Sequence, residues 1–256
     1  MTLEDEFGDI IKKARKGLGI SLKDLALKSL ISEKDISSME SYKLKPNGEQ
    51  IKNISKILNL SEKKLINIIL NNWEPKKGKL KSNSIKVVKI ENDYHGYLAN
   101  SYIVVKGKNA LLIDTGANLQ NAIYTLKELN VKLLGILLTH GHGDHVYGAG
   151  GISKMFNCEI FRDFSSDRDL KINNFNVKVF FTPGHTTKSC SYLVDNFLFV
   201  GDELFAGSIG NSEIPYEKHL ETIRKKIFTL EDDVVILPGH GPITTVKEEK
   251  ENNPFF

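Results

Sequence analysis

The chain has 256 residues, of which 40% are apolar and 26% charged, with a net charge of +3 and two cysteines. This composition is typical of a globular protein with one large domain or two smaller ones, and two cysteines exclude a disulfide-based scaffold. The absence of an apolar run of about 18 residues excludes a membrane span, and the acidic start of the chain excludes a signal peptide. We therefore expect a cytoplasmic protein that does not associate with membranes.

Residues 5–70 predict a series of short amphipathic helices. Apolar residues recur at helical spacing, Ser21 and Ser32 are suitable N-caps, and Pro46 separates the third helix from the fourth. Residues 1–80 hold 16 Lys and Arg against 11 Asp and Glu, so this part is the basic one.

The pattern changes after residue 74. Residues 75–83 are polar and contain Pro75 and Gly78, which is typical of a linker. From residue 84 the chain shows short β-branched runs, including IKVVKI, SYIVVKG and ALLIDTG, which predict strands. We therefore predict a helical domain at 1–74, a linker at 75–83 and a larger domain at 84–256.

The stretch SLKDLALKSLISEKDISSMESYKLKP, residues 21–46, resembles the lambda-repressor-like helix-turn-helix family. The resemblance implies a recognition helix at 32–41 and makes DNA and a homodimer candidate partners. Two features depart from the family: Leu30 stands where a glycine is usual, and the recognition helix carries three acidic residues. A helical module that binds another protein remains the alternative. The candidate DNA contacts are Lys34, Ser37, Ser38 and Lys43.

A cluster of metal-ligand residue types follows the apolar run LLGILLT. His140, His142, Asp144 and His145 lie within six positions, on the loop that leaves a predicted buried strand. Two further histidines, His185 in TPGHT and His240 in LPGHG, and Asp202 after NFLFVGD also follow predicted strands. Imidazoles and carboxylates suit zinc, iron or manganese, and without a cation their clustering would be costly. The pattern predicts a metal centre.

Residues 84–256 resemble the metallo-β-lactamase superfamily, and GDELFAGSIG and LPGHGPITTV resemble its glyoxalase-II-like hydrolases. The resemblance implies an α/β (α+β) fold: an αββα sandwich, here preceded by a small all-α helix-turn-helix domain. It also implies two divalent metals, zinc in the first place and iron or manganese as alternatives. Asp202 would bridge them, and Asp114 in LLIDTG would support the metal loop. The implied ligands are His140, His142 and His185 for the first metal, and Asp144, His145 and His240 for the second.

This resemblance implies a hydrolase of thioesters or esters that acts on a small molecule. Asp144 and Asp202 would orient the attacking water, and Tyr147 and Asn211 are candidate substrate contacts. Asn211 stands where the glyoxalase-II-like branch usually has arginine. Two alternatives remain: a mononuclear iron persulfide dioxygenase that uses the first site only, and a transcriptional regulator whose metal domain senses a ligand or metal.

Overall fold

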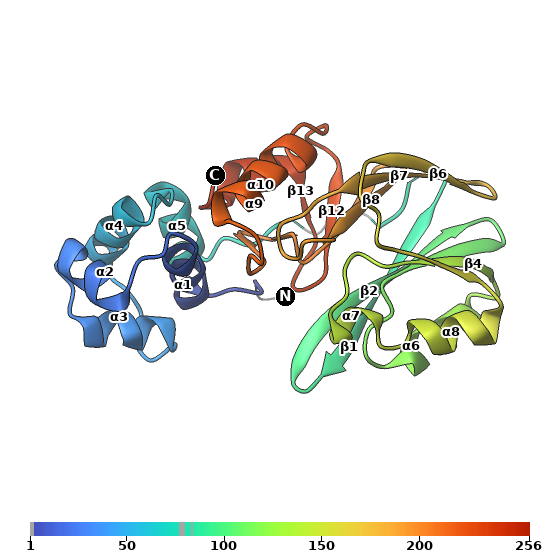
Figure 1. Ribbon diagram of the computed structural model, residues 1–256, viewed down its shortest axis with the longest axis horizontal. Helices are drawn as coiled ribbons and strands as arrows, with labels where there is room; N and C mark the ends of the chain where they lie inside the picture. The colour runs from blue at the N-terminus through green and yellow to red at the C-terminus, as the bar shows by residue number, and fades with distance from the viewer. Residues whose placement is uncertain (1–2, 77–79, 83) are drawn as a thin grey trace.

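The computed structural model describes residues 3–76, 80–82 and 84–256, so part of the predicted linker, residues 77–79 and 83, lies outside the described residues. Five helices precede the first strand (Figure 1). They lie where the sequence predicts helices, at α1 (Phe7–Gly17), α2 (Leu22–Ser29), α3 (Glu33–Glu40), α4 (Gly48–Ile57) and α5 (Glu62–Ile69).

The two predicted N-caps begin the helices of the helix-turn-helix. The Ser21 hydroxyl accepts a hydrogen bond from the Asp24 amide at 3.0 Å, and the Ser32 hydroxyl accepts one from the Asp35 amide at 3.1 Å. These bonds satisfy backbone donors that have no partner within the helix. The turn between α2 and α3 passes through Leu30, whose φ of 58° is left-handed.

The first sheet has five strands in the order β1-β2-β3-β4-β5. The first three strands are antiparallel, and β3, β4 and β5 run parallel. Helices α6 (Leu119–Glu128), α7 (Gly143–Val146) and α8 (Ala149–Phe156) belong to its connections. The strands are β1 (Lys86–Tyr94), β2 (Tyr97–Lys106), β3 (Asn109–Ile113), β4 (Lys132–Leu137) and β5 (Glu159–Phe161).

The second sheet has six strands in the order β13-β12-β9-β8-β7-β6, and β10 and β11 form a separate hairpin. The strands are β6 (Arg168–Ile172), β7 (Phe175–Phe181), β8 (Cys190–Val194), β9 (Phe197–Gly201), β10 (Leu204–Phe205), β11 (Ser208–Ile209), β12 (Val235–Pro238) and β13 (Thr244–Thr245). The last helices are α9 (Tyr216–Thr222), which continues into the π-helical turn η1 (Ile223–Ile227), and α10 (Val246–Asn252).

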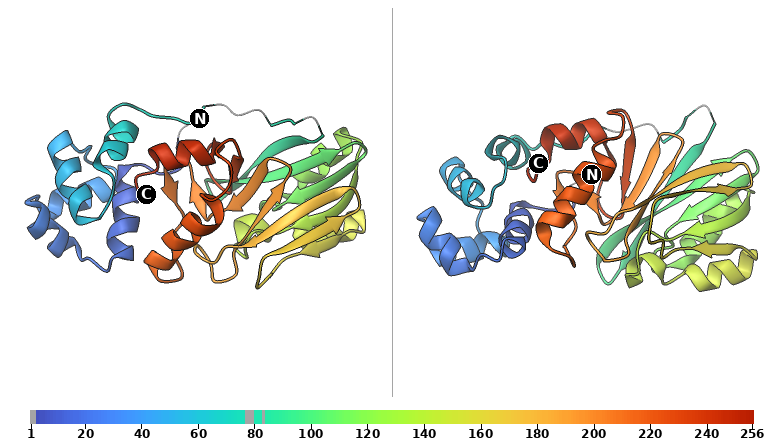
Figure 2. Two further views of the ribbon diagram at one scale, coloured as in Figure 1. Left: turned by 90° about the horizontal axis from the view of Figure 1, so that it is seen from above. Right: turned by 45° about the horizontal axis from the view of Figure 1, so that its top comes forward.

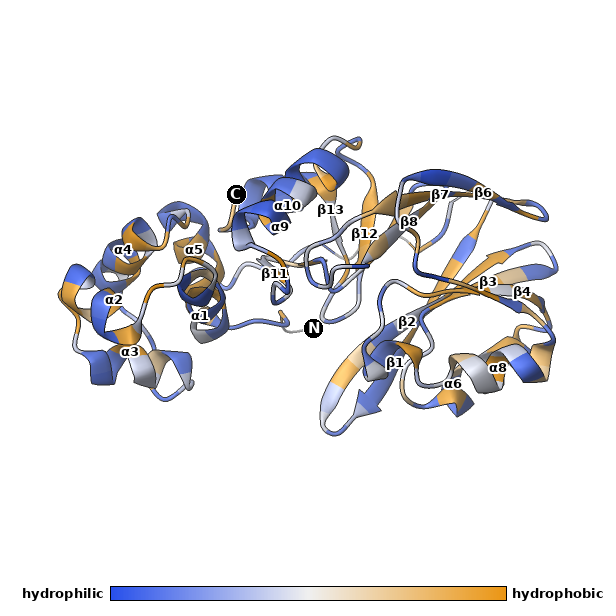
Figure 3. Ribbon diagram, viewed as in Figure 1, coloured by the Kyte–Doolittle hydropathy of each residue, from blue (hydrophilic) through white to orange (hydrophobic). Residues whose placement is uncertain are grey.

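The two sheets pack face to face and form the αββα sandwich expected from the sequence. Apolar residues of both sheets, such as Tyr102, Leu137, Tyr192 and Phe199, form the core between them. Helices α6 and α8 cover the first sheet, and α9 and α10 cover the second (Figures 1 and 2). Hydrophobic residues dominate β12, whereas α9 and α10 have mixed faces, as a layer between core and surface requires (Figure 3).

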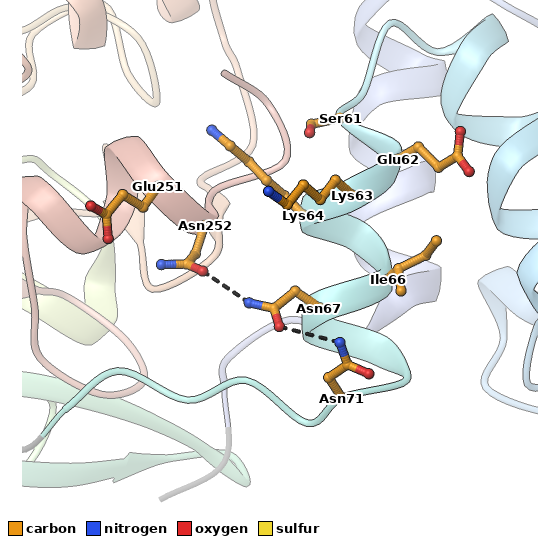
Figure 4. Close-up of a pocket in the computed structure, with 9 residues that line it drawn as sticks. All are labelled: Ser61, Glu62, Lys63, Lys64, Ile66, Asn67, Asn71, Glu251 and Asn252. Atoms are coloured by element: carbon orange, nitrogen blue, oxygen red, sulfur yellow. Dashed lines mark hydrogen bonds between the residues drawn. The ribbon is translucent and has the colours of Figure 1, made fainter.

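The N-terminal helices share one apolar core with the C-terminal helices of the sandwich. The Lys64 ammonium donates to the backbone oxygens of Lys250 and Phe256, each at 2.7 Å. Asn67 donates to Asn252 at 2.9 Å (Figure 4). Helix α1 approaches so closely that a Cβ on Gly17 would lie 2.4 Å from the Tyr216 ring. The helix-turn-helix is therefore packed on the sandwich as an outer layer.

Among the described residues, no helix combines the length and the apolar character that crossing a membrane requires.

Candidate metal centre

The seven predicted ligands converge at one edge of the sandwich. Strands β7, β9 and β12 run in the same direction, so their carboxyl ends meet there, and β4 of the first sheet ends at the same place. His140, His142, His185 and Asp202 each offer a ligand atom, and these atoms all lie within 4.8 Å of one another. Asp144, His145 and His240 form a second group that meets the same criterion.

Asp202 lies between the two groups. Its Oδ2 is 3.6 Å from His185 Nε2 in the first group and 3.4 Å from His240 Nε2 in the second. Its Oδ1 is 3.3 Å from His145 Nε2. One carboxylate therefore faces both sets of imidazoles, as a bridging ligand must.

The donor set fits divalent cations. Within the part of the chain that the structure describes, His140 Nε2 and Asp202 Oδ1 are buried and have no hydrogen-bond partner. His185 Nε2 faces His142 Nδ1 at 2.9 Å, and His145 Nε2 faces His240 Nε2 at 3.3 Å. Buried polar atoms without partners are rare, and a cation would satisfy these atoms together.

Three of the five imidazoles are anchored through Nδ1 to a carbonyl or carboxylate oxygen so that Nε2 points inward. His185 Nδ1 donates to the Asn211 carbonyl oxygen and His240 Nδ1 to that of Leu98, both at 2.8 Å. His145 Nδ1 donates to Asp114 Oδ2 at 2.9 Å. Such bonds orient the rings so that, in the neutral imidazole, the Nε2 lone pair faces the metal position.

Close backbone approach accounts for the glycines that precede two of the histidines. A Cβ on Gly239 would lie 2.1 Å from Asp202 Oδ1, and one on Gly184 would lie 1.9 Å from Glu203 Oε1. The PGH sequences at 183–185 and 238–240 therefore place the backbone against buried carboxylates, where a side chain would not fit.

Burial and neighbouring charge shift the pKa values of the cluster in opposite directions. Burial lowers the pKa of His140 well below its usual range, which favours the neutral imidazole that binds metal. Burial alone would raise the pKa of the Asp202 carboxyl, but His145 and His240 beside it bring that pKa well below its usual range. The geometry thus keeps Asp202 ionised and His140 neutral.

A buried pair that the sequence motifs did not single out supports His185. Glu203 Oε2 accepts a hydrogen bond from the His185 amide at 3.2 Å, and Glu203 Oε1 lies 3.2 Å from His219 Nε2. His219 Nδ1 lies 2.7 Å from the Ser212 hydroxyl. His219 belongs to an amphipathic helix without a motif, so only its fully buried position reveals this role.

A cleft of about 380 Å³ opens onto the cluster; we call it the metal cleft. Asn211 lines the cleft, whereas Tyr147 is 72% exposed and is not among the lining residues that the structure describes. Part of the wall belongs to the N-terminal segment, which sequence patterns did not connect with the site. The lining residues are Glu4, Asp5, Asp9, Lys13, Tyr94, Tyr97, Asp144, His185, Asp202, Phe205, Gly210, Asn211 and His240.

Comparison with known proteins agrees with this fold. Residues 96–163 match the metallo-beta-lactamase superfamily, and residues 11–65 match a helix-turn-helix family. The chain is 32% identical over 186 residues to hydroxyacylglutathione hydrolase GloC of Haemophilus influenzae, covering 58% of this chain and 88% of that protein. It is 30% identical over 214 residues to the probable metallo-hydrolase M6_Spy0554 of Streptococcus pyogenes, covering 67% of this chain and 90% of the relative.

The structural comparison includes the BLEG-1 B3 metallo-beta-lactamase, with a TM-score of 0.63 and 27% identity over 66% of this chain and 98% of that one. The chain belongs to the metallo-β-lactamase superfamily and carries an N-terminal helix-turn-helix. Its superfamily relatives are hydrolases, and its His and Asp cluster is suited to divalent metal ions.

Proposed function

We propose that this protein is a dinuclear metal-dependent hydrolase of thioesters. The position of Asp202, within reach of both histidine groups, carries the proposal, because it allows one carboxylate to serve two cations. The first cation would be held by His140, His142 and His185, and the second by Asp144, His145 and His240. Zinc is the metal that this mixture of imidazoles and carboxylates suits best.

When bound, two such cations supply Lewis acidity toward a carbonyl oxygen and lower the pKa of water. The chain's own groups would do the rest. Asp144 Oδ2, 3.3 Å from His240 Nε2, lies beside the cleft and can accept a proton from the attacking water. The rings of Tyr94, Tyr97 and Phe205 line the cleft and offer an apolar surface for an acyl group.

The likeness to GloC supports the choice of substrate class, because hydroxyacylglutathione is a thioester. The persulfide dioxygenase alternative needs one iron at the first site only. The complete second group, Asp144, His145 and His240, allows a second metal but does not exclude the dioxygenase, so metal content separates the two functions.

Metal analysis and a substrate panel test this proposal. We expect about two zinc ions per chain and turnover of thioesters, measured by thiol release, in preference to lactones, phosphodiesters and β-lactams. His185→Ala should lower kcat/KM by more than about 100-fold, the upper end of the losses seen when only a ligand's support is removed. Lys154→Ala, on the exposed side of α8, is the control. One iron per chain, or full activity of the His185 variant, would contradict the proposal.

We also propose DNA binding by the helix-turn-helix, because the structure removes part of the acidic character of α3. The Glu40 carboxylate is buried and accepts two hydrogen bonds from the Arg15 guanidinium, at 2.6 and 2.7 Å, so it does not face a ligand. Lys34, Ser37 and Lys43 are exposed, and Ser38 is half-buried. Phosphate contacts by the two lysines would position α3 on a duplex, and such motifs usually bind as dimers.

Fluorescence anisotropy with duplex DNA at low salt tests DNA binding, and light scattering tests the dimer. Lys43→Ala should weaken binding on all sequences and reduce the slope of log K against log salt by about 1. Lys63→Ala, on α5, should change neither. Binding that is absent at low salt would refute this second function.

A further inference from the structure

Helix α1 of the helix-turn-helix is fixed against the loop that bears Asn211. The Asp5 carboxylate accepts hydrogen bonds from the Ser208 hydroxyl and the Lys13 ammonium, and Lys13 also donates to the Ile209 carbonyl oxygen at 2.7 Å. Asp5 is buried, and Lys13 is mostly so. Helix α1 is therefore held in place as part of the surface beside the metal cleft.

A second hollow of about 270 Å³ lies between α1 and the 209–216 loop; we call it the lysine groove. It shares Lys13, Gly210 and Asn211 with the metal cleft, so the two hollows adjoin. A substrate whose carbonyl lies at the cluster could extend from one into the other. The groove is lined by Lys13, Lys16, Gly17, Ile209, Gly210, Asn211, Ser212, Ile214, Pro215 and Tyr216.

The charges of the two hollows differ. The outer wall of the metal cleft carries Glu4 and Asp9, whereas no carboxylate is among the groove's described lining residues. The Lys13 charge is balanced by Asp5. Lys16 is exposed, and within residues 3–76, 80–82 and 84–256 no carboxylate forms an ion pair with its ammonium group. Glu213, the acid nearest along the loop, lies 3.7 Å from His142 Nε2 instead.

We propose that Lys16 and the Asn211 amide bind a carboxylate that the substrate carries a few bonds from its scissile carbonyl. One ammonium and one amide donor match the single charge of a carboxylate. Glu4 and Asp9 in the metal cleft would repel a substrate carboxylate placed there instead. The ammonium would come from helix α1 and the amide from the 209–216 loop, so both parts of the chain would contribute to this site. The proposal takes its chemistry from the proposed thioesterase activity, but its binding test does not depend on turnover.

Calorimetry on the zinc-loaded protein with inert ketones tests the site. In 5-oxohexanoate a methylene replaces the thioester sulfur, and 7-oxooctanoate offers a longer reach; 5-oxohexanamide is the neutral partner of the first. At least one keto acid should bind wild type about three- to fivefold more tightly than the amide, as expected for one exposed ion pair. Lys16→Ala should abolish that preference and Lys16→Glu should reverse it. Lys12→Ala, on the same helix but outside both sets of lining residues, should preserve it.

Two results would overturn the site: no preference for either keto acid in wild type, or a preference that survives Lys16→Ala. Hydrolysis of the acetyl thioester of 3-mercaptopropionate separates this outcome from a failure of the proposed activity. If zinc-loaded protein cleaves no thioester while the preference depends on Lys16, the activity is refuted and the carboxylate site stands. If thioesters are cleaved without that preference, the site alone is refuted.

Discussion

At Asp114 a single carboxylate connects three segments of chain. Its oxygens accept hydrogen bonds from the Thr139 amide at 2.8 Å, the Thr139 hydroxyl at 2.7 Å and His145 Nδ1 at 2.9 Å. The residue has a φ of 53°, a conformation that aspartate tolerates better than most side chains. The strand end at β3, the metal loop and a metal-site histidine are thereby fixed together.

Asp114→Asn should weaken metal binding by about 10- to 100-fold, the range found for lost support of a ligand. An amide has one acceptor oxygen and therefore cannot serve all three donors, so either His145 or Thr139 loses its partner. Competition with a chromophoric zinc chelator measures the change. Asp93→Asn, on the exposed end of β1, should bind metal as wild type does; equal affinities for both variants would show that Asp114 does not act through His145.

Two residues of the helix-turn-helix other than glycine and asparagine adopt left-handed conformations. Leu30 has a φ of 58° and is 90% exposed, so it gains little from packing. Tyr42 has a φ of 61°, but its hydroxyl donates a hydrogen bond to the Asp9 carboxylate. The same backbone strain is therefore compensated at one position and not at the other.

Leu30→Gly should raise the free energy of unfolding by about 0.5 kcal/mol, because relief of left-handed strain exceeds the entropy that glycine adds to the unfolded chain. Tyr42→Gly should lower it, because the Asp9 bond is lost together with the ring. Urea unfolding of both variants measures the difference. A destabilised Leu30 variant would show that its exposed side chain makes contacts that outweigh the strain.

At the scale of elements, one buried carboxylate ties helix α10 to the β10–β11 hairpin. Glu249 accepts hydrogen bonds from the Gly207 amide at 3.0 Å, Asn253 Nδ2 at 2.9 Å and the Thr244 hydroxyl at 2.7 Å. The side chain is fully buried. Burial raises the pKa of Glu249 to about 7, against the ordinary 4.5, because three neutral donors do not offset the lost hydration.

The raised pKa of Glu249 predicts that this residue makes the free energy of unfolding depend on pH. Between pH 4.5 and 7 the unfolded chain has released this proton while the folded chain keeps it, so stability falls as pH rises. Glu249→Gln does not titrate, and its amide can donate to Thr244 in place of accepting. The unfolding free energy of the variant minus that of wild type should therefore rise by about 2.5 kcal/mol from pH 5 to pH 8.

Exposed Glu251→Gln is the control for this prediction, and its difference from wild type should stay level with pH. Urea titrations at four pH values measure both differences. If the difference in unfolding free energy between Glu249→Gln and wild type also does not change with pH, the carboxyl has the same pKa in the folded and the unfolded chain. Burial of Glu249 would then not raise its pKa.

Helices and strand ends were predictable where local pattern determines them. Helical periodicity and the caps Ser21 and Ser32 located the N-terminal helices, and apolar runs ending in Pro-Gly-His located two strand ends of the metal centre. Contacts between distant segments were not predictable. Lys13 reaches a carbonyl 196 positions away, and Glu40 turns inward to Arg15, although nothing in the sequence of its helix distinguishes it from Glu33 and Asp35. Such contacts depend on tertiary packing, for which neither period nor spacing gives a signal.

At the scale of the whole molecule, the helix-turn-helix and the sandwich are continuous in both core and hydrogen bonding. Apolar residues of α1, α4 and α5 belong to one cluster with those of α9 and η1. The single tryptophan, Trp73, lies at this junction, where a Cβ on Gly207 would be 3.3 Å from its ring. Its fluorescence therefore reports on the interface between the two parts.

We expect the two parts to unfold together, with metal stabilising both. In urea, Trp73 fluorescence and far-UV circular dichroism should give coincident transitions in chelated and in zinc-loaded protein. Free zinc at 100 times Kd should raise the unfolding free energy by about 2.7 kcal/mol per site in both signals, since zinc binds only the folded chain.

Lys64→Met removes two hydrogen bonds across the junction. The Trp73 transition of this variant should therefore occur at a lower urea concentration than its circular dichroism transition, whereas in exposed Lys63→Met the two should still coincide. If zinc does not shift the Trp73 transition of wild type, the N-terminal helices unfold independently of the metal centre. Helix α1 would then be too loosely held to form a wall of the metal cleft.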